Sequence, residues 1–333
     1  MSAPRLERAL DDLRRRWVPD LRLGVFDVEI GDKRLSGCVS SRGALEELRR
    51  LAADSGLGDE LRLLPDDSIG GDAAAIVTAG LAPLLGQPTL RAPRVSECLH
   101  GEALAVLERR GDWLRVRAAD GYHGWLHAGY VGLGPGDWAE DWTARATARS
   151  VGAELVFAEG RLRLPVGARV ALGSRGGVET ADGRHGGIAE GEVRPEGELR
   201  AEARHLSPPE LGLRWFSGAP YLWGGRTEWG IDCSGFAQAV YAARGLTLLR
   251  DSDQQVSQGR EVAIATGGAG YESGDMLFFA EEGKVSHVAL WLGAGRVAHS
   301  ALSRGGVAID DLSAQTPLAK RLRDQLVAVR RIV

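Results

Sequence analysis

The chain has no long uninterrupted apolar segment, and this excludes a helix that crosses a bilayer. Its longest apolar stretch, residues 73–85, is broken by Thr78, Gly80 and Pro83, whereas a spanning helix needs about 20 apolar residues. The N-terminal sequence MSAPRLERALDDLRRRW has basic residues but no apolar core. We therefore expect no signal peptide, no membrane span and a cytoplasmic location.

An excess of positive charge is also missing. The chain carries 41 basic and 45 acidic residues, a formal net charge of −4, so no nucleic-acid partner is expected. Lysine occurs only at Lys33, Lys284 and Lys320, and arginine supplies the other basic residues. The Arg, Ala and Gly richness is typical of a GC-rich bacterial genome.

Cysteine is scarce. Cys38, Cys98 and Cys233 form an odd set without a CxxC motif, so neither a disulfide framework nor a zinc ribbon is expected. A reduced compartment fits this usage. We expect no cofactor and no metal, and no feature of the sequence indicates an oligomeric state.

What the chain has in excess is glycine, 46 of 333 residues, about twice the usual ~7%. Such an excess favours many tight turns, as in small β-barrels. At about 100–200 residues per domain, the length predicts two or three domains. The fold class that we expect is α+β.

Residues 1–90 are predicted to form an N-terminal α/β accessory domain, because helical spacing over 6–17 and 44–53 flanks an alternating strand at 23–29. Residues 91–135 contain short strands and glycine turns. Their pattern GE…GDW…DGYxGW, with Trp113 and Trp125, resembles a bacterial SH3-like barrel. Residues 136–205 are predicted to form a second, degenerate barrel in which RLRLPVGARVALG is a hairpin and GRHGGIAEGEVRPEGELR is mostly loop.

Residues 206–333 carry the chemistry. A helix is predicted at Pro208–Phe216 with Ser207 as N-cap, and another at Phe236–Arg244, ended by Gly245. Cys233 falls just before the second helix, where backbone N–H groups and the helix dipole favour a thiolate. A lone cysteine in this position is structural more often than catalytic.

Two histidines downstream strengthen the catalytic interpretation. His287 and His299 fall in two predicted strands joined by Gly293-Ala294-Gly295-Arg296. A three-residue loop centred on Ala294 would pair Leu292 with Arg296 and place both rings on one face; a two-residue loop would separate them.

The segments PYLWGGRTEWGIDCSGFAQAVYAARG, RDSDQQ, GDMLFF, SHVALWL and VAHS resemble, in order, the NlpC/P60 cysteine peptidases, which have a papain-like core. The resemblance covers residues 206–333. It implies that Cys233 is the nucleophile, that His287 is the general base and that His299 holds the imidazole of His287. It further implies that Tyr221 helps to stabilise the oxyanion, while Asp232 ties down the turn.

The run RDSDQQ resembles members that are preceded by SH3-like domains and bind the free α-amine of an N-terminal L-Ala. The resemblance assigns Asp251 and Ser252 to this amine subsite, together with a tyrosine and an acid from a barrel. We expect Tyr122 and Glu97 in these roles, with Tyr130 and Glu102 as the rival candidates. Trp223 is expected to line the substrate site, with loop packing as its alternative role.

The implied substrate is a murein peptide, L-Ala-γ-D-Glu linked to a diamino acid such as meso-diaminopimelate or Lys. The bond cut is the γ-D-Glu–diamino acid amide, and the implied process is peptidoglycan recycling. The alternatives are an exported hydrolase of intact wall, a papain-like acyltransferase, an inactive binding module, and a zinc site built from one cysteine and two histidines.

Overall fold

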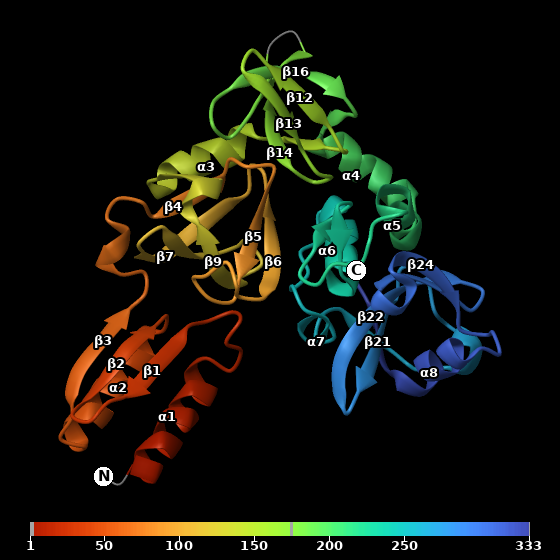
Figure 1. Ribbon diagram of the computed structural model, residues 1–333. Coiled ribbons are helices and arrows are strands. Elements are labelled where there is room, and N and C mark those ends of the chain that lie inside the picture. The colour runs from red at the N-terminus through yellow and green to blue at the C-terminus, as the bar shows by residue number, and fades with distance from the viewer. Residues whose placement is uncertain (1–2, 174–175, 333) are drawn as a thin grey trace.

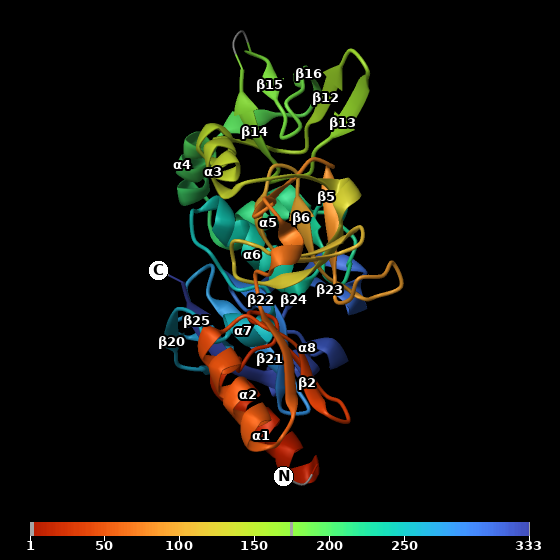
Figure 2. The ribbon, with the colours of Figure 1, turned by 90° about the vertical axis from the view of Figure 1, so that its left-hand side faces the viewer.

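The computed structural model describes residues 3–173 and 176–332. In Figure 1 the N-terminal unit lies at the lower left, the first barrel above it, the second barrel at the top and the C-terminal domain on the right. Figure 2 shows the second barrel and the N-terminal unit at opposite ends of the molecule. Within the described residues, no helix is long and apolar enough to cross a membrane.

The N-terminal unit packs two helices on a small sheet. Its elements are α1 (Ala3–Trp17), β1 (Phe26–Ile30), β2 (Arg34–Val39), α2 (Arg42–Asp54) and β3 (Gly58–Leu63). Strand β2 pairs antiparallel with β1 and parallel with β3. Leucines at helical spacing on α1 and α2 pack against this sheet, so the two predicted helices are confirmed.

The first barrel begins earlier than the sequence predicts. Its seven strands are β4 (Ala74–Val77), β5 (Leu81–Leu85), β6 (Arg94–Leu99), β7 (Ala103–Arg110), β8 (Trp113–Arg117), β9 (His123–His127) and β10 (Val131–Gly134). They are ordered β10-β4-β7-β8-β9-β5-β6. The expected boundary at residue 90 is wrong, because the apolar stretch that we assigned to the N-terminal domain supplies β4 and β5 to the barrel core.

Helix α3 (Gly136–Arg145) leads to the second barrel. Its strands are β11 (Ala148–Ser150), β12 (Glu154–Phe157), β13 (Gly160–Arg163), β14 (Arg169–Leu172), β15 (Val178–Glu179), β16 (His185–Glu190) and β17 (Val193–Pro195). The predicted 161–173 hairpin is wrong, since β13 pairs with β12 whereas β14 pairs with β11 and β15. The predicted loop at 183–200 contains β16, β17 and the start of a helix; β16 is mostly exposed and so lacks apolar alternation.

The C-terminal domain places helices and short strands before its main sheet. It contains α4 (Glu196–His205), α5 (Pro208–Phe216), β18 (Arg226–Thr227), β19 (Gly230–Ile231), α6 (Cys233–Ala243), α7 (Ser252–Gln255), β20 (Arg260–Val262), β21 (Met276–Glu281), β22 (Lys284–Gly293), β23 (Arg296–Ala301), β24 (Gly306–Asp311), α8 (Pro317–Gln325) and β25 (Leu326–Arg331). Short 3₁₀ turns also occur at 67–69, 128–130, 266–268 and 302–304.

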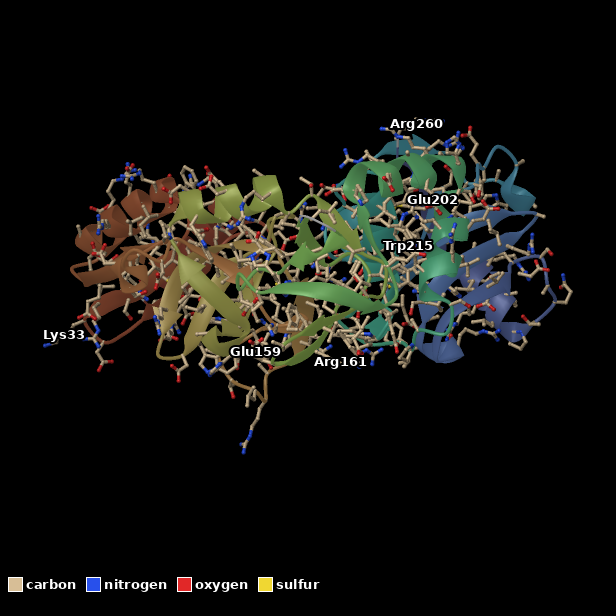
Figure 3. All side chains as sticks on the ribbon, turned by 90° about the horizontal axis from the view of Figure 1, so that it is seen from above. Lys33, Glu159, Arg161, Glu202, Trp215 and Arg260 are labelled. Atoms are coloured by element: carbon tan, nitrogen blue, oxygen red, sulfur yellow. The ribbon has the colours of Figure 1, made fainter. Side chains whose placement is uncertain are left out.

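The main sheet of this domain has the order β20-β25-β21-β22-β23-β24. Apolar side chains on one face pack against α5 and α6, and those on the other face pack against α8. Because both faces are covered, the central strands are continuously apolar. Seen from above, Lys33 of the N-terminal unit lies at the left-hand end of the molecule, and Arg260 lies on the upper edge of the C-terminal domain (Figure 3).

Candidate active site

Cys233 is the first residue of α6, and the turn before it is tightly fixed. The Asp232 carboxylate accepts hydrogen bonds from the N–H of Gly235 at 2.6 Å and of Gly224 at 2.9 Å, so it caps the helix as N-cap residues do. A side chain at Gly235 would lie 2.3 Å from the carbonyl oxygen of Gly225. The turn therefore accepts only glycine at position 235. The Asp232 cap and this close packing together fix the position of Cys233 at the helix start.

A buried ion pair stabilises this turn. Arg250 has no exposed surface, and its guanidinium donates to both oxygens of Asp232, at 3.1 and 2.7 Å. It also donates to Ser234 on α6 and to Ser96 on β6 of the first barrel. Arg250 thus joins the nucleophile turn to the barrel, and Asp232 has the structural position that the sequence predicts.

Replacing Arg250 by alanine is expected to lower the free energy of unfolding by about 3–5 kcal/mol, because it leaves the buried Asp232 carboxylate unpaired. Urea unfolding followed by circular dichroism measures this loss. Arg260→Ala, at an exposed arginine on the sheet edge, is the control and should stay within about 0.5 kcal/mol of the wild type. Equal midpoints for the two variants would contradict a stabilising role for this ion pair.

The two histidines meet across the hairpin β22–β23. Nε2 of His287 lies 2.8 Å from Nδ1 of His299. The pairing of Leu290 with Ala298 and of Trp291 with Val297 gives the predicted register. The predicted Leu292–Arg296 pair is wrong, since Gly293 pairs with Arg296 across a two-residue turn and Leu292 lies at an irregularity. A bulge shifts the register by one residue, so the short turn still leaves both rings on one face.

Asp310 extends this pair, and sequence reasoning missed it. Its Oδ2 lies 2.9 Å from Nε2 of His299. The hydrogen bond to His299, stronger than the opposing burial, lowers the pKa of Asp310, so this carboxylate is ionised and can only accept. His299 therefore donates from Nε2 and accepts at Nδ1 from Nε2–H of His287. The Nδ1 of His287 is left unprotonated, as a general base requires.

The electrostatics favour an uncharged thiol and imidazole at rest. Burial, with the negative charge of Asp232, raises the pKa of Cys233 to about 12, while hydrogen bonds from the N–H groups of Val288 and Ser234 oppose the shift. Burial also lowers the pKa of His287 to about 3, assisted by His299. The thiolate expected from the helix start alone is thus outweighed by desolvation. A neutral His287 is able to accept the thiol proton during attack.

The structure places Tyr221 close to the nucleophile and Trp223 at the surface. Burial, followed by the electrostatic influence of the neighbouring Cys233, raises the pKa of Tyr221, so its phenol stays protonated and able to donate. Trp223 is 66% exposed, which argues against simple loop packing. An exposed indole beside the nucleophile turn is available to a substrate.

The predicted amine subsite comes together from two domains. The Tyr122 hydroxyl, on the turn before β9, donates to Oδ2 of Asp251 at 3.0 Å. Ser252 is buried as the first residue of α7. The rival Tyr130 lies in the 3₁₀ turn after β9, where its carbonyl binds Thr78. Of the two tyrosines, Tyr122 is the one in contact with Asp251.

Glu97, the acid that we expected in the subsite, binds two arginines. Its Oε1 pairs with Arg94, and its Oε2 accepts from the N–H of Arg226 at 2.9 Å. Glu102 also pairs with Arg226, at 3.0 Å. Both acids thus join the first barrel to the catalytic domain, and their carboxylates are already engaged by arginine. A charged group that contacts Asp251 from another unit is Arg22, 229 residues earlier in the chain, which no local signal could have revealed.

A thiol at a helix start, a His–His–Asp chain on the adjacent sheet and this helix-plus-sheet core define a papain-like cysteine peptidase domain. Residues 218–325 match the NlpC/P60 family and residues 84–129 match the bacterial dipeptidyl-peptidase SH3 domain. The chain therefore contains an NlpC/P60 catalytic domain preceded by a dipeptidyl-peptidase SH3 domain, as the sequence predicts. Within the part of the chain that the structure describes, no cluster of three His, Cys, Asp or Glu could hold a metal ion.

Curated relatives carry related names. The chain is 38% identical over 120 residues to a γ-D-glutamyl-L-lysine dipeptidyl-peptidase of Bacillus subtilis, and this match covers 35% of the chain but only 38% of that relative. Dipeptidyl-peptidase 6 of Lysinibacillus sphaericus is 28% identical over 270 residues, which cover 74% of the chain and 94% of the relative.

Two solved structures share the fold. An NlpC/P60 family protein from Bacillus cereus has a TM-score of 0.63 at 20% identity and covers 78% of this chain and 99% of its own. An NlpC/P60 endopeptidase from Photobacterium damselae has a TM-score of 0.57 at 13% identity, with 80% and 72% covered. These likenesses show that the α+β arrangement extends beyond the catalytic domain.

Proposed function

We propose that this protein is a cysteine peptidase that cleaves the γ-D-Glu–diamino acid amide of wall peptides with a free N-terminal L-Ala. The observation that carries the proposal is the Tyr122–Asp251 contact, which joins the barrel to the catalytic domain at a half-buried carboxylate. A carboxylate at this position can bind a substrate ammonium through a charge-assisted hydrogen bond. A longer chain has no ammonium at this position and would forgo this charge-assisted hydrogen bond, which costs binding energy. The names of the relatives support the same peptide class.

The geometry supports a thioester route. The Cys233 sulfur attacks the γ-carbonyl carbon of D-Glu while its proton passes to Nδ1 of His287. The phenol of Tyr221 and the N–H of Cys233 stabilise the developing oxyanion. His287 then gives the proton to the leaving amine of the diamino acid. Water hydrolyses the thioester, releases L-Ala-D-Glu and restores the thiol.

The test is cleavage of L-Ala-γ-D-Glu-diaminopimelate and its N-acetylated form, followed by mass spectrometry. Acetylation removes the ammonium, so we expect kcat/KM to fall by at least about tenfold, the worth of a charge-assisted hydrogen bond. Tyr122→Phe should reduce the ratio of kcat/KM for the free peptide to kcat/KM for the acetylated peptide. Tyr130→Phe should leave that ratio unchanged. Equal turnover of the free and acetylated peptides would overturn the amine requirement.

A peptidase with this requirement acts after the amide between stem peptide and sugar has been cut. We therefore place the proposed reaction in the recycling of wall fragments, with the cytoplasm as its compartment. Replacing diaminopimelate by Lys in the same assay identifies the preferred diamino acid. Fractionation of host cells tests the compartment, and recovery of the protein in the wall fraction would contradict it.

A further inference from the structure

The turn between α1 and β1 lies on the side of the N-terminal unit that faces α7 of the catalytic domain (Figure 1), and its Arg22 side chain binds Asp253 on α7. Its backbone is fixed to the first barrel: the carbonyl of Arg22 accepts from the N–H of His123 at 3.0 Å. The ring of His123 also binds the carbonyl of Gly24 at 3.1 Å. His123 directly follows Tyr122, so the turn is anchored beside the tyrosine of the amine subsite.

The Arg22 side chain is held by three carboxylates. It donates to Oδ2 of Asp251 at 2.9 Å, to both oxygens of Asp253 at 2.7 and 2.9 Å, and to both oxygens of Asp20 at 2.9 Å. The amide of Gln254 on α7 donates to Asp20 at 2.7 Å. Two residues of one turn therefore engage α7 at its first turn, which makes a built contact between the N-terminal unit and the subsite.

We infer that Arg22 is a positioning residue of the amine subsite, and that the N-terminal unit thereby completes the binding site for the substrate's N-terminal ammonium. This inference rests on the proposed function. Arg22 and Tyr122 both hold Oδ2 of Asp251, and the Asp251 side chain also caps the first turn of α7, so three segments fix the orientation of this carboxylate. The carboxylates of Asp20, Asp251 and Asp253 outnumber the guanidinium groups of Arg22 and Arg250, so the local charge is negative and a cationic group is still attracted.

Arg22 also helps to keep Asp251 ionised. The charged groups around Asp251 are Arg250 and Arg22, with Asp253 and Asp20 across the guanidinium. Burial raises the pKa of Asp251, while Arg250, Arg22 and the Tyr122 hydroxyl oppose the shift. Without Arg22, the two other carboxylates would face Asp251 without their counterion. The pKa of Asp251 should then rise further, and its charge should be lost at a higher pH.

The experiment measures kcat and KM of full-length Arg22→Ala against pH, with the free-amine peptide. We expect KM to rise about tenfold at neutral pH with kcat within about twofold, and the acidic limb of kcat/KM to move to higher pH. Arg22→Lys keeps a positive charge beside Asp251. Its acidic limb of kcat/KM should lie at the wild-type pH, even if its KM recovers only in part. Arg34→Ala, which removes an exposed ion pair of the same unit, is the matched control.

The outcomes separate this inference from the proposed function. Equal cleavage of acetylated and free peptide by the wild type removes the amine subsite itself. A wild type that prefers the free amine, with an Arg22→Ala variant of unchanged KM and pH profile, overturns the role of Arg22 alone. If Arg22→Ala fails to fold, the Arg22→Lys variant decides. An acidic limb of kcat/KM that lies at higher pH than in the wild type, although lysine keeps the positive charge, also overturns the role of Arg22.

Discussion

Cys233→Ala is expected to lower the rate of peptide cleavage by at least about 1,000-fold, because no other group near the helix start can form the thioester. Within the described structure, Cys38 and Cys98 are buried in other units, in β2 and β6. The turn before Cys233 is held by Asp232 and Arg250 and not by the thiol, so the variant should keep its fold.

The measurement is mass spectrometry of L-Ala-γ-D-Glu-diaminopimelate digests, with thermal unfolding to show that the variant is folded. Cys38→Ala is the control: it removes a buried thiol from the N-terminal unit and should keep turnover, although it should lose some stability through the cavity. Retained cleavage by folded Cys233→Ala would refute the nucleophile assignment.

Asp310→Asn is expected to lower kcat by about 100- to 10,000-fold with little change in KM, as wrong tautomers do in other catalytic triads. Arg304 Nε lies 3.6 Å from Oδ1 of Asp310, so the amide oxygen of asparagine should face Arg304 and its NH₂ should face His299. His299 must then carry its proton on Nδ1 and donate to Nε2 of His287. The proton of His287 would move to Nδ1, which removes the general base.

Steady-state kinetics of this variant test the tautomer argument. Asp311→Asn is a matched control on the next residue, because its exposed carboxylate binds Ser313 in the adjoining turn. A kcat of Asp310→Asn within about threefold of the wild type would show that Asp310 does not set the tautomer of His299. His299→Ala should also lower kcat. Because the two residues act as one unit, the double variant should have a kcat no lower than that of the less active single variant.

The three units meet at one small site, and this has a consequence for engineering. Asp251 belongs to the catalytic domain, Tyr122 to the first barrel and Arg22 to the N-terminal unit. We expect an isolated catalytic domain to retain the thiol chemistry but to lose selection for the free amine. The proposal therefore assigns substrate selection to the accessory units, and the reaction itself to Cys233, His287, His299 and Asp310.

The sequence by itself determined the catalytic domain, through its resemblance to the NlpC/P60 peptidases, and that resemblance predicts Cys233, His287 and His299 as the reactive groups. Local signals support the prediction: a small-residue turn before a helix, and two neighbouring strands that carry the histidines, although the loop length that decides their faces stayed open. The same locality explains the errors. The boundary at residue 90 failed because apolar strands β4 and β5 resemble any buried segment, and strand β16 was missed because it is exposed on nearly every residue.

Only the tertiary structure decided which charged groups share a site. Arg22 and Asp251 are 229 residues apart, Tyr122 and Asp251 are 129 apart, and no periodicity connects such positions. The bulge at Leu292 preserves a register that its two-residue turn would otherwise break. Desolvation likewise exists only in the folded chain: burial gives Cys233 and His287 their neutral forms, and it is packing, not sequence, that removes water from them.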